Sequence, residues 1–139
     1  MSDQVALIEP IHIEKQQIHE RMELVGNYND YQKHWMQVAW QISKDKDFMY
    51  MLKAENGLLN HDRKHDAGKN SVGTDWGFCG TNDYWHKDKV NDPRFFSDPK
   101  WQLEKCYEMF KGGTTFYGYK RIKKDPAFRK KIQAHFKFY

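Results

Sequence analysis

Two carboxyl residues, Glu55 and Asp75, have types and surroundings suited to acid–base chemistry. Glu55 is the last member of an apolar helical series, at i+7 from Phe48 and i+3 from Leu52. A carboxyl group on the core side of a helix is desolvated, and the C-terminal end of the helix dipole acts in the same direction, so we expect a raised pKa. A carboxyl group that stays protonated near neutral pH is what a general acid requires. The alternative is that the apolar series ends at Leu52 and that Glu55 is exposed.

Asp75 lies in the turn-rich segment 72–77, close to two glycines and to polar groups. Such a segment is hydrated, and a carboxylate there should stay ionised. Two carboxyl groups in contrasting environments are what cleavage of a glycosidic bond needs. One protonates the leaving oxygen, and the other stabilises or covalently traps the oxocarbenium-like sugar. The alternative is that Asp75 is a turn residue that bonds its own backbone.

The segments before Asp75 must position these groups, and their apolar spacing predicts helices. Helices are expected over residues 11–25, 28–42 and 45–56, with Gly57 at the end of the third. The helical pattern stops after this helix. Residues 60–82 contain four glycines among Asn, Asp, Ser and Thr, which predicts short strands and a hairpin.

The helical pattern returns after the hairpin. Asp98 is the expected N-cap and Pro99 the first residue of a helix that ends at Gly112-Gly113. A last, basic helix is expected to start at Asp125-Pro126 and to continue through Phe136. The sequence therefore predicts a single α+β, mainly α domain over residues 1–139. It has a helical lobe, a small β-hairpin lobe and a cleft between them, where ligands tend to bind.

The composition is that of a globular protein, with 39% hydrophobic and 30% charged residues in a chain of 139. The net charge of +4 favours anionic polymers, among them nucleic acid and bacterial cell wall. Only two cysteines occur, Cys79 and Cys106, whereas small secreted domains usually contain more. We therefore expect free, buried thiols, and a single disulfide is the alternative. The N-terminus shows no signal-peptide pattern and no apolar run reaches the ~20 residues of a membrane span, so we expect synthesis in the cytoplasm without stable membrane insertion.

Two segments together resemble animal-type lysozymes. The run from Thr74 to Asn82, TDWGFCGTN, followed by Tyr84-Trp85, is similar to their strand-and-turn motif, roughly TDYGILQIN and then two tryptophans. Residues 51–57, MLKAENG, resemble the end of the lysozyme helix that carries the catalytic acid. The spacing of about twenty residues between the two acids is also similar, and the resemblance extends over residues 45–111.

The resemblance implies a lysozyme-like fold and hydrolysis of the β-1,4 bond between N-acetylmuramic acid and N-acetylglucosamine in peptidoglycan. It implies that Glu55 is the general acid and Asp75 the nucleophile or electrostatic stabiliser. It assigns sugar contacts to Asn82 and Trp85, with Tyr84 and His86 beside them. No cofactor or metal is implied, and the expected partner of this monomer is peptidoglycan rather than nucleic acid.

This chain also departs from the animal pattern. Gly80 replaces a Gln of the family, His86 replaces one of the two tryptophans, and the family's disulfide cysteines are absent. Gly80 alters the expected subsite contacts, whereas the missing disulfides favour a phage or bacterial relative, such as an endolysin released to the wall or carried in a virion. A lytic transglycosylase on the same fold is an alternative. Such an enzyme uses the glutamate but needs no second carboxylate, so the presence of Asp75 argues against it. A non-enzymatic wall-binding or virion structural protein is another.

Other polar clusters favour less specific interpretations. His61 and His65 are spaced i, i+4, and His86 or Asp83 would have to complete a zinc site, so a solvated loop is the preferred interpretation. The basic runs 120–124 and 129–131 are typical of solvated helix faces that attract anionic polymers.

Overall fold

Seven helices and two small antiparallel sheets make up the part of the chain that the computed structural model describes, which is residues 18–55, 57–58, 60–66 and 72–139. This is the α+β, mainly α class that the sequence predicts. The helices are α2 (Asp30–Ser43), α3 (Lys46–Glu55), α4 (Lys87–Val90), α5 (Arg94–Ser97), α6 (Pro99–Lys111), α7 (Tyr117–Lys124) and α8 (Pro126–Gln133). The strands are β1 (Met22–Leu24), β2 (Lys64–Asp66), β3 (Thr74–Trp76), β4 (Thr81–Asn82) and β5 (Phe136–Phe138).

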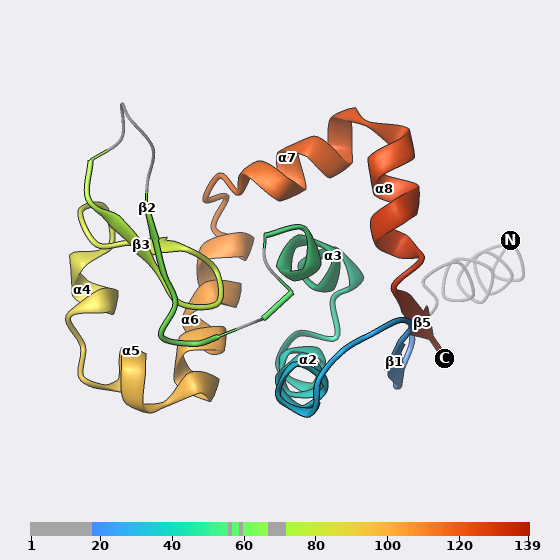
Figure 1. Ribbon diagram of the computed structural model, residues 1–139, viewed down its shortest axis with the longest axis horizontal. Helices are drawn as coiled ribbons and strands as arrows, with labels where there is room; N and C mark the ends of the chain where they lie inside the picture. The colour runs from blue at the N-terminus through green and yellow to red at the C-terminus, as the bar shows by residue number, and fades with distance from the viewer. Residues whose placement is uncertain (1–17, 56, 59, 67–71) are drawn as a thin grey trace, which may run out of the picture.

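Helix α3 lies at the centre of the fold, between the β2-β3-β4 sheet and the C-terminal helices (Figure 1). It contacts α2, α7 and α8. Its side chains Phe48, Met51 and Leu52 are fully buried, as the apolar spacing predicts, and Met49 is fully buried as well. Gly57 closes the helix end: with a φ of +68° it donates its N–H to the carbonyl of Leu52 at 2.9 Å. Glu55 is thereby the last helical residue, at the edge of the core.

The predicted β hairpin is present as the three-stranded sheet β2-β3-β4. Its register places His65 opposite Asp75 and Asp75 opposite Asn82. The sheet and the short helices α4 and α5 form the left side of the molecule in Figure 1. Asp75 therefore occupies the central strand of this lobe.

Helix α6 begins as the sequence predicts, with Pro99 in the first turn and the Asp98 carboxylate accepting the N–H of Trp101 at 3.1 Å. One turn further on, the buried Gln102 connects the helix to the β lobe. Its amide donates to the carbonyls of His61 and Phe95, both at 2.8 Å, and its oxygen accepts the N–H of Phe78 at 2.7 Å. Each of these bonds satisfies a polar group that burial would otherwise penalise.

The expectation of free thiols is wrong, because Cys79 and Cys106 form a disulfide. Both residues are buried, as expected. The number of cysteines says nothing about their distance in the fold. The turn after β3 packs against α6, which brings the two Cα atoms to 6.3 Å although 27 residues separate them in sequence.

Reduction of this disulfide should lower the free energy of unfolding by about 2–4 kcal/mol, because the cross-link restricts the unfolded chain. The measurement is denaturant unfolding with and without a reductant. The double variant Cys79→Ala/Cys106→Ala is the control, and its stability should not respond to reductant. Two free thiols in the denatured, unreduced protein would contradict the assignment.

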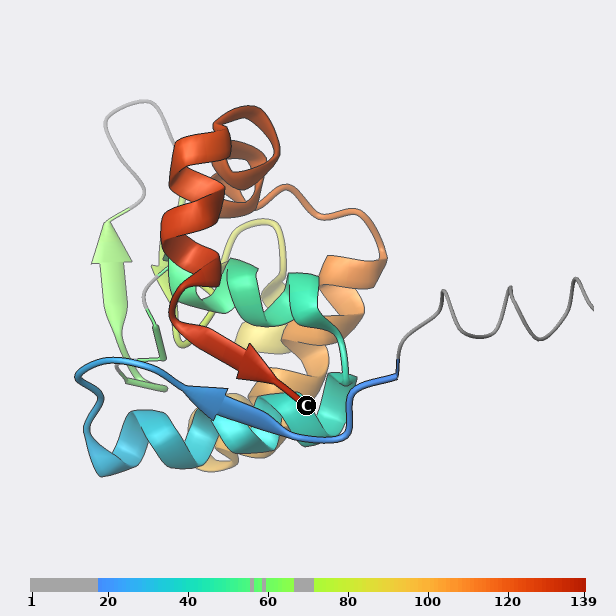
Figure 2. The ribbon, with the colours of Figure 1, turned by 90° about the vertical axis from the view of Figure 1, so that its right-hand side faces the viewer.

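The terminal segments differ from the predicted helices. Residues 18–25 of the expected helix 11–25 contain strand β1, and residues 11–17 lie outside the described residues. Phe136, which the sequence pattern assigns to the last helix, belongs to β5, which pairs antiparallel with β1 (Figure 2). Leu24 faces Phe136 across this pair. Each of these strands has only three residues. An alternating pattern of that length is too short to be distinguished from a helical pattern in the sequence, so the sequence predicts helix for both segments.

Among the described residues no helix is both long and apolar enough to cross a bilayer.

Candidate active site

Glu55 lies where the end of α3 meets the start of α7. Its Oε1 accepts the backbone N–H of Gly118 at 2.9 Å. Gly118 is in the first turn of α7, where backbone N–H groups have no partner within the helix. A Cβ atom at Gly118 would stand 2.7 Å from the Cβ of Ala54 and 3.0 Å from its carbonyl carbon. Only glycine therefore lets α7 approach α3 closely enough to bind the carboxyl group.

The pKa of Glu55 is raised above its ordinary value, mainly because burial disfavours the charged form. The hydrogen bond from Gly118 acts in the opposite direction, the negative charge of Asp75 raises the pKa further, and the charge of His65 lowers it. The direction of the net shift agrees with the sequence expectation. The charge of Asp75 in strand β3 thus acts in the same direction as burial on the carboxyl group at the end of α3.

Asp75 is half-buried, and the side chain of Asn82 fixes its orientation. The amide Nδ2 of Asn82 donates to Oδ1 of Asp75 at 3.0 Å and to the carbonyl of Val72 at 2.9 Å. Its Oδ1 accepts the N–H groups of Tyr84 and Trp85 at 2.9 and 3.2 Å. Asn82 therefore holds both the second carboxylate and the start of the aromatic segment.

Asp83, the residue after Asn82, also joins the end of β4 to strand β3. Its carboxylate accepts the N–H of Thr74 at 2.9 Å and the indole N–H of Trp76 at 3.2 Å. These two bonds are the main reason why the pKa of the Asp83 carboxyl is lowered. An acid that is already bonded in this way serves the structure of the hairpin rather than a metal ion.

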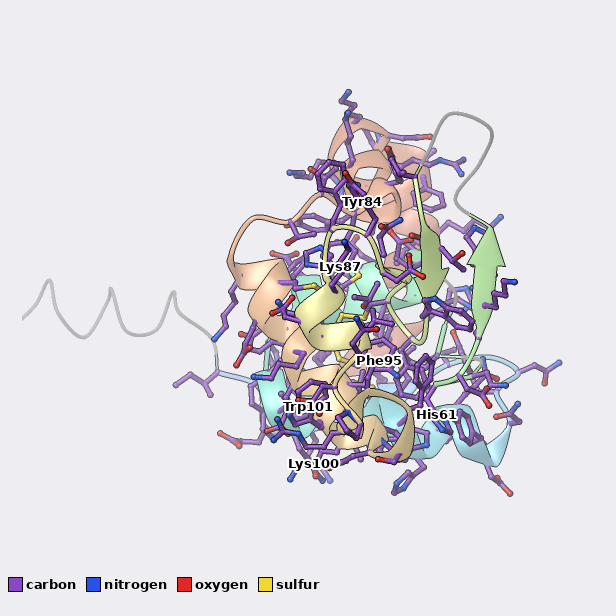
Figure 3. The ribbon with its side chains drawn as sticks, turned by 90° about the vertical axis from the view of Figure 1, so that its left-hand side faces the viewer. His61, Tyr84, Lys87, Phe95, Lys100 and Trp101 are labelled. Atoms are coloured by element: carbon purple, nitrogen blue, oxygen red, sulfur yellow. A yellow bond between two sulfur atoms is a disulfide. The ribbon has the colours of Figure 1, made fainter. Side chains whose placement is uncertain are left out.

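Tyr84 and Trp85 are exposed aromatic side chains beside this turn. They remain 47% and 69% accessible, and their rings form an edge contact with centroids 4.8 Å apart. Tyr84 lies at the upper end of the face shown in Figure 3, with Lys87 below it. His86 precedes α4, and burial lowers the pKa of its imidazole. Exposed rings of this kind can stack on sugar faces, whereas core aromatics cannot.

Replacement of Trp85 by Ala should leave the melting temperature nearly unchanged, because the ring makes little contact with the core. The measurement is thermal unfolding. Phe95→Ala is the contrasting variant: its ring is buried and its loss should cost about 3–5 kcal/mol of stability. A large drop in melting temperature for Trp85→Ala would instead assign the ring to packing.

The histidines that suggested a metal site are not brought together. His61 shares a hydrogen bond of 2.6 Å with the hydroxyl of Tyr31, and it lies at the opposite end of the face in Figure 3 from Tyr84. His65 lies beside Asp75 in the sheet. Within the described ranges, no group of three or more His, Cys, Asp or Glu side chains is arranged to hold a metal ion.

A cavity of about 290 Å³ lies between the end of α6 and the start of α7, apart from Glu55 and Asp75. Neither Glu55 nor Asp75 contributes to its wall. The residues that line it are Phe110, Gly113, Thr114, Thr115, Phe116, Tyr119, Lys120 and Lys123.

Sequence reasoning misses two residues that support the site, Gly118 and Gln102. In the sequence, Gly118 stands just before the basic run 120–124 and attracts no attention as a site residue. The one signal is its position between two tyrosines, since a small residue between large ones is typical of close helix packing. Gln102 is one polar residue inside an apolar helical series, the same kind of signal that points to Glu55.

Comparison of the chain with protein-family models, with curated proteins and with solved structures finds no match.

Proposed function

We propose that this protein is a peptidoglycan-cleaving glycoside hydrolase of the lysozyme-like type, which cuts the β-1,4 bond between N-acetylmuramic acid and N-acetylglucosamine. The observation that carries the proposal is the half-buried Glu55 at the end of α3, whose carboxyl group accepts the Gly118 N–H and whose pKa is raised by burial and by the charge of Asp75. A carboxyl group that keeps its proton, together with a second carboxylate, is the pair that glycoside hydrolysis uses. The motif resemblance of residues 45–111 supplies the substrate class. The proposal needs no cofactor, and its site of action is the bacterial cell wall.

Glu55 acts as the general acid. Because the Gly118 N–H bonds to Oε1, this oxygen is the carbonyl oxygen of the protonated carboxyl group and Oε2 carries the proton. Proton transfer from Oε2 to the glycosidic oxygen releases the leaving sugar. Desolvation keeps the proton on the acid until that step, and the bond from Gly118 stabilises the carboxylate that results.

Asp75 acts as the second carboxylate. The bond from Asn82 fixes its Oδ1, which leaves Oδ2 to face the positive charge that develops on the sugar. The exposed rings of Tyr84 and Trp85 lie on the same turn and offer apolar faces to neighbouring sugar units.

Replacement of Gly118 by Ala tests the role of the Gly118 bond. The new Cβ would displace α7 from Ala54, and misplacement of the acid should lower activity by about 10- to 100-fold. Because the lost bond normally lowers the pKa of Glu55, the decline of activity at high pH should move to higher pH. The double variant Ala54→Gly/Gly118→Ala, which removes the closest contact, should regain part of both properties. A lower melting temperature with an unchanged pH profile would assign Gly118 to packing alone.

The direct test of the proposal is digestion of purified peptidoglycan, measured by loss of turbidity and by mass analysis of the fragments. The expected products are muropeptides with a reducing N-acetylmuramic acid end. Intact walls after digestion with folded protein would exclude the hydrolase and leave a non-enzymatic wall-binding or virion structural role.

A further inference from the structure

Helices α7 and α8 belong to a strongly basic part of the chain. Residues 111–139 contain nine Lys or Arg and one acidic residue, a net charge of +8. Residues 1–110 contain 14 Lys or Arg and 18 Asp or Glu, a net charge of −4. The overall value of +4 therefore hides a pronounced asymmetry, and asymmetry of this kind is typical of proteins that meet a polyanion.

The basic side chains of the two helices point to solvent. The apolar side of α7 is anchored by the buried Ile122 and that of α8 by the buried Ile132. The exposed basic residues, here called the α7–α8 basic surface, are Lys120, Arg121, Lys123, Lys124, Arg129, Lys130 and Lys131. The two helices pack against each other along one side of the molecule (Figure 1).

This charge is poorly compensated within the described part of the chain. Arg121 is 3.9 Å from Asp125, and none of the other six basic residues has an ion pair with another described residue. Like charges gathered on two short adjoining helices repel one another, and a bound polyanion would relieve that repulsion.

The surface also adjoins the candidate active site and the cavity between α6 and α7. Gly118, in the first turn of α7, binds the Glu55 carboxyl group, so the basic helix starts at the candidate active site. Lys120 and Lys123 line the cavity of about 290 Å³, to whose wall Thr114 and Thr115 also contribute. Ammonium and hydroxyl groups around a cavity suit a phosphate group with attached hydroxyls.

We propose that the α7–α8 basic surface binds the flexible polyol-phosphate polymers of bacterial walls and so holds the chain on its substrate. This proposal rests on the proposed wall hydrolase function for the choice of polymer. A flexible single chain can follow two helices and place a phosphate in the cavity, whereas a stiff DNA duplex cannot bend into it. A bilayer is disfavoured because Ile122 and Ile132 are buried in the protein and Tyr117 is the one large hydrophobic residue of α7 and α8 that is strongly exposed, which is too little apolar surface to enter lipid.

The test compares two triple variants, both made in the inactive Glu55→Gln chain so that binding does not depend on cleavage. The first, Lys120→Gln/Lys124→Gln/Lys130→Gln, removes three charges from the α7–α8 basic surface. The matched control, Lys33→Gln/Lys100→Gln/Lys105→Gln, removes three charges from α2 and α6. Binding of each full-length chain to poly(glycerol phosphate) is measured by fluorescence anisotropy over a range of salt concentrations.

The first variant should bind about tenfold more weakly or worse, with a salt dependence reduced by about 2 in the logarithmic slope, roughly 0.7 per charge removed. The control should keep the affinity of the parent. Equal losses in both variants would overturn the proposal, because net charge alone would then explain binding. Tighter binding of duplex DNA or of phosphatidylglycerol vesicles than of the polymer would overturn it in favour of those partners. A chain that binds the polymer but clears no wall would refute the hydrolase and leave this surface assignment standing.

Discussion

The variant Glu55→Gln is expected to lose wall-clearing activity by about 10²- to 10⁴-fold while it keeps the fold. The amide is nearly isosteric, and its oxygen can still accept the Gly118 N–H, but it cannot give a proton to the leaving oxygen. The measurement is the rate of turbidity loss with purified walls. The control is Glu104→Gln on the exposed side of α6, which should leave the rate unchanged. Retention of more than roughly a tenth of the activity would remove Glu55 from the acid role.

The same variant has an expected effect on stability, because the pKa of Glu55 is raised in the folded chain above the ordinary value of 4.5. Between these two pKa values the folded state binds more protons than the unfolded state, so the free energy of unfolding falls as pH rises through that interval. The glutamine side chain of the variant carries no charge at any pH and avoids this loss. The variant should therefore unfold at a higher temperature than the parent at pH 7, and the difference should disappear at a pH below the ordinary value. If the variant unfolds at a lower temperature than the parent at pH 7, the folded chain stabilises the ionised Glu55 carboxylate, and the expected effect of burial is wrong.

The second large effect is expected for Asp75→Asn, which should lower the hydrolysis rate by about 10²-fold or more. The amide keeps the oxygen that accepts the Asn82 bond but loses the negative charge that faces the developing oxocarbenium ion. Wall fragments from the parent should end in reducing sugars without an anhydro ring. The matched control is Asp62→Asn, an exposed carboxylate near the same sheet. Retention of configuration at the cleaved bond, measured by NMR, is expected from the lysozyme resemblance.

Anhydro-ring products would change the class of the enzyme. A lytic transglycosylase uses a hydroxyl group of its own substrate to complete the reaction, so it needs the acid Glu55 but not Asp75. Anhydro products together with an active Asp75→Asn variant would therefore move the protein to that class. Loss of activity in both variants with reducing products keeps the hydrolase.

The parts of the fold around the candidate site that the sequence predicts correctly depend on local signals. Helix α3 is specified by four buried side chains at helical spacing, so the position of Glu55 at the helix end follows from the pattern. The glycine-rich composition predicts the hairpin, and Asp98 with Pro99 predicts the start of α6. In each case residues within about ten positions of one another determine the structure.

The parts that cannot be predicted from the sequence depend on contacts between distant segments. Glu55 meets Gly118 across 63 positions, and Cys79 meets Cys106 across 27. Apart from Gly118 between two tyrosines, helix α7 gives no sign in the sequence of belonging to the site, because its charged face dominates and its single buried residue, Ile122, is a weak apolar signal. The β1–β5 pair joins the two ends of the described chain, and no local period indicates such a partner.

The turn after β3 is joined to α6 by two links of different chemistry, the Cys79–Cys106 disulfide and the hydrogen bond from Phe78 to Gln102. The two links occupy neighbouring residues on the turn and successive turns of the helix, so each holds the same junction. The hydrogen-bonded link forms without an oxidant, and the covalent one only after two thiols are oxidised. The lobe that carries Asp75 can thus be held in place by the hydrogen bond before the thiols are oxidised, and oxidation then adds resistance to unfolding. The geometry of this junction and its durability therefore depend on different conditions, and only the second needs an oxidant.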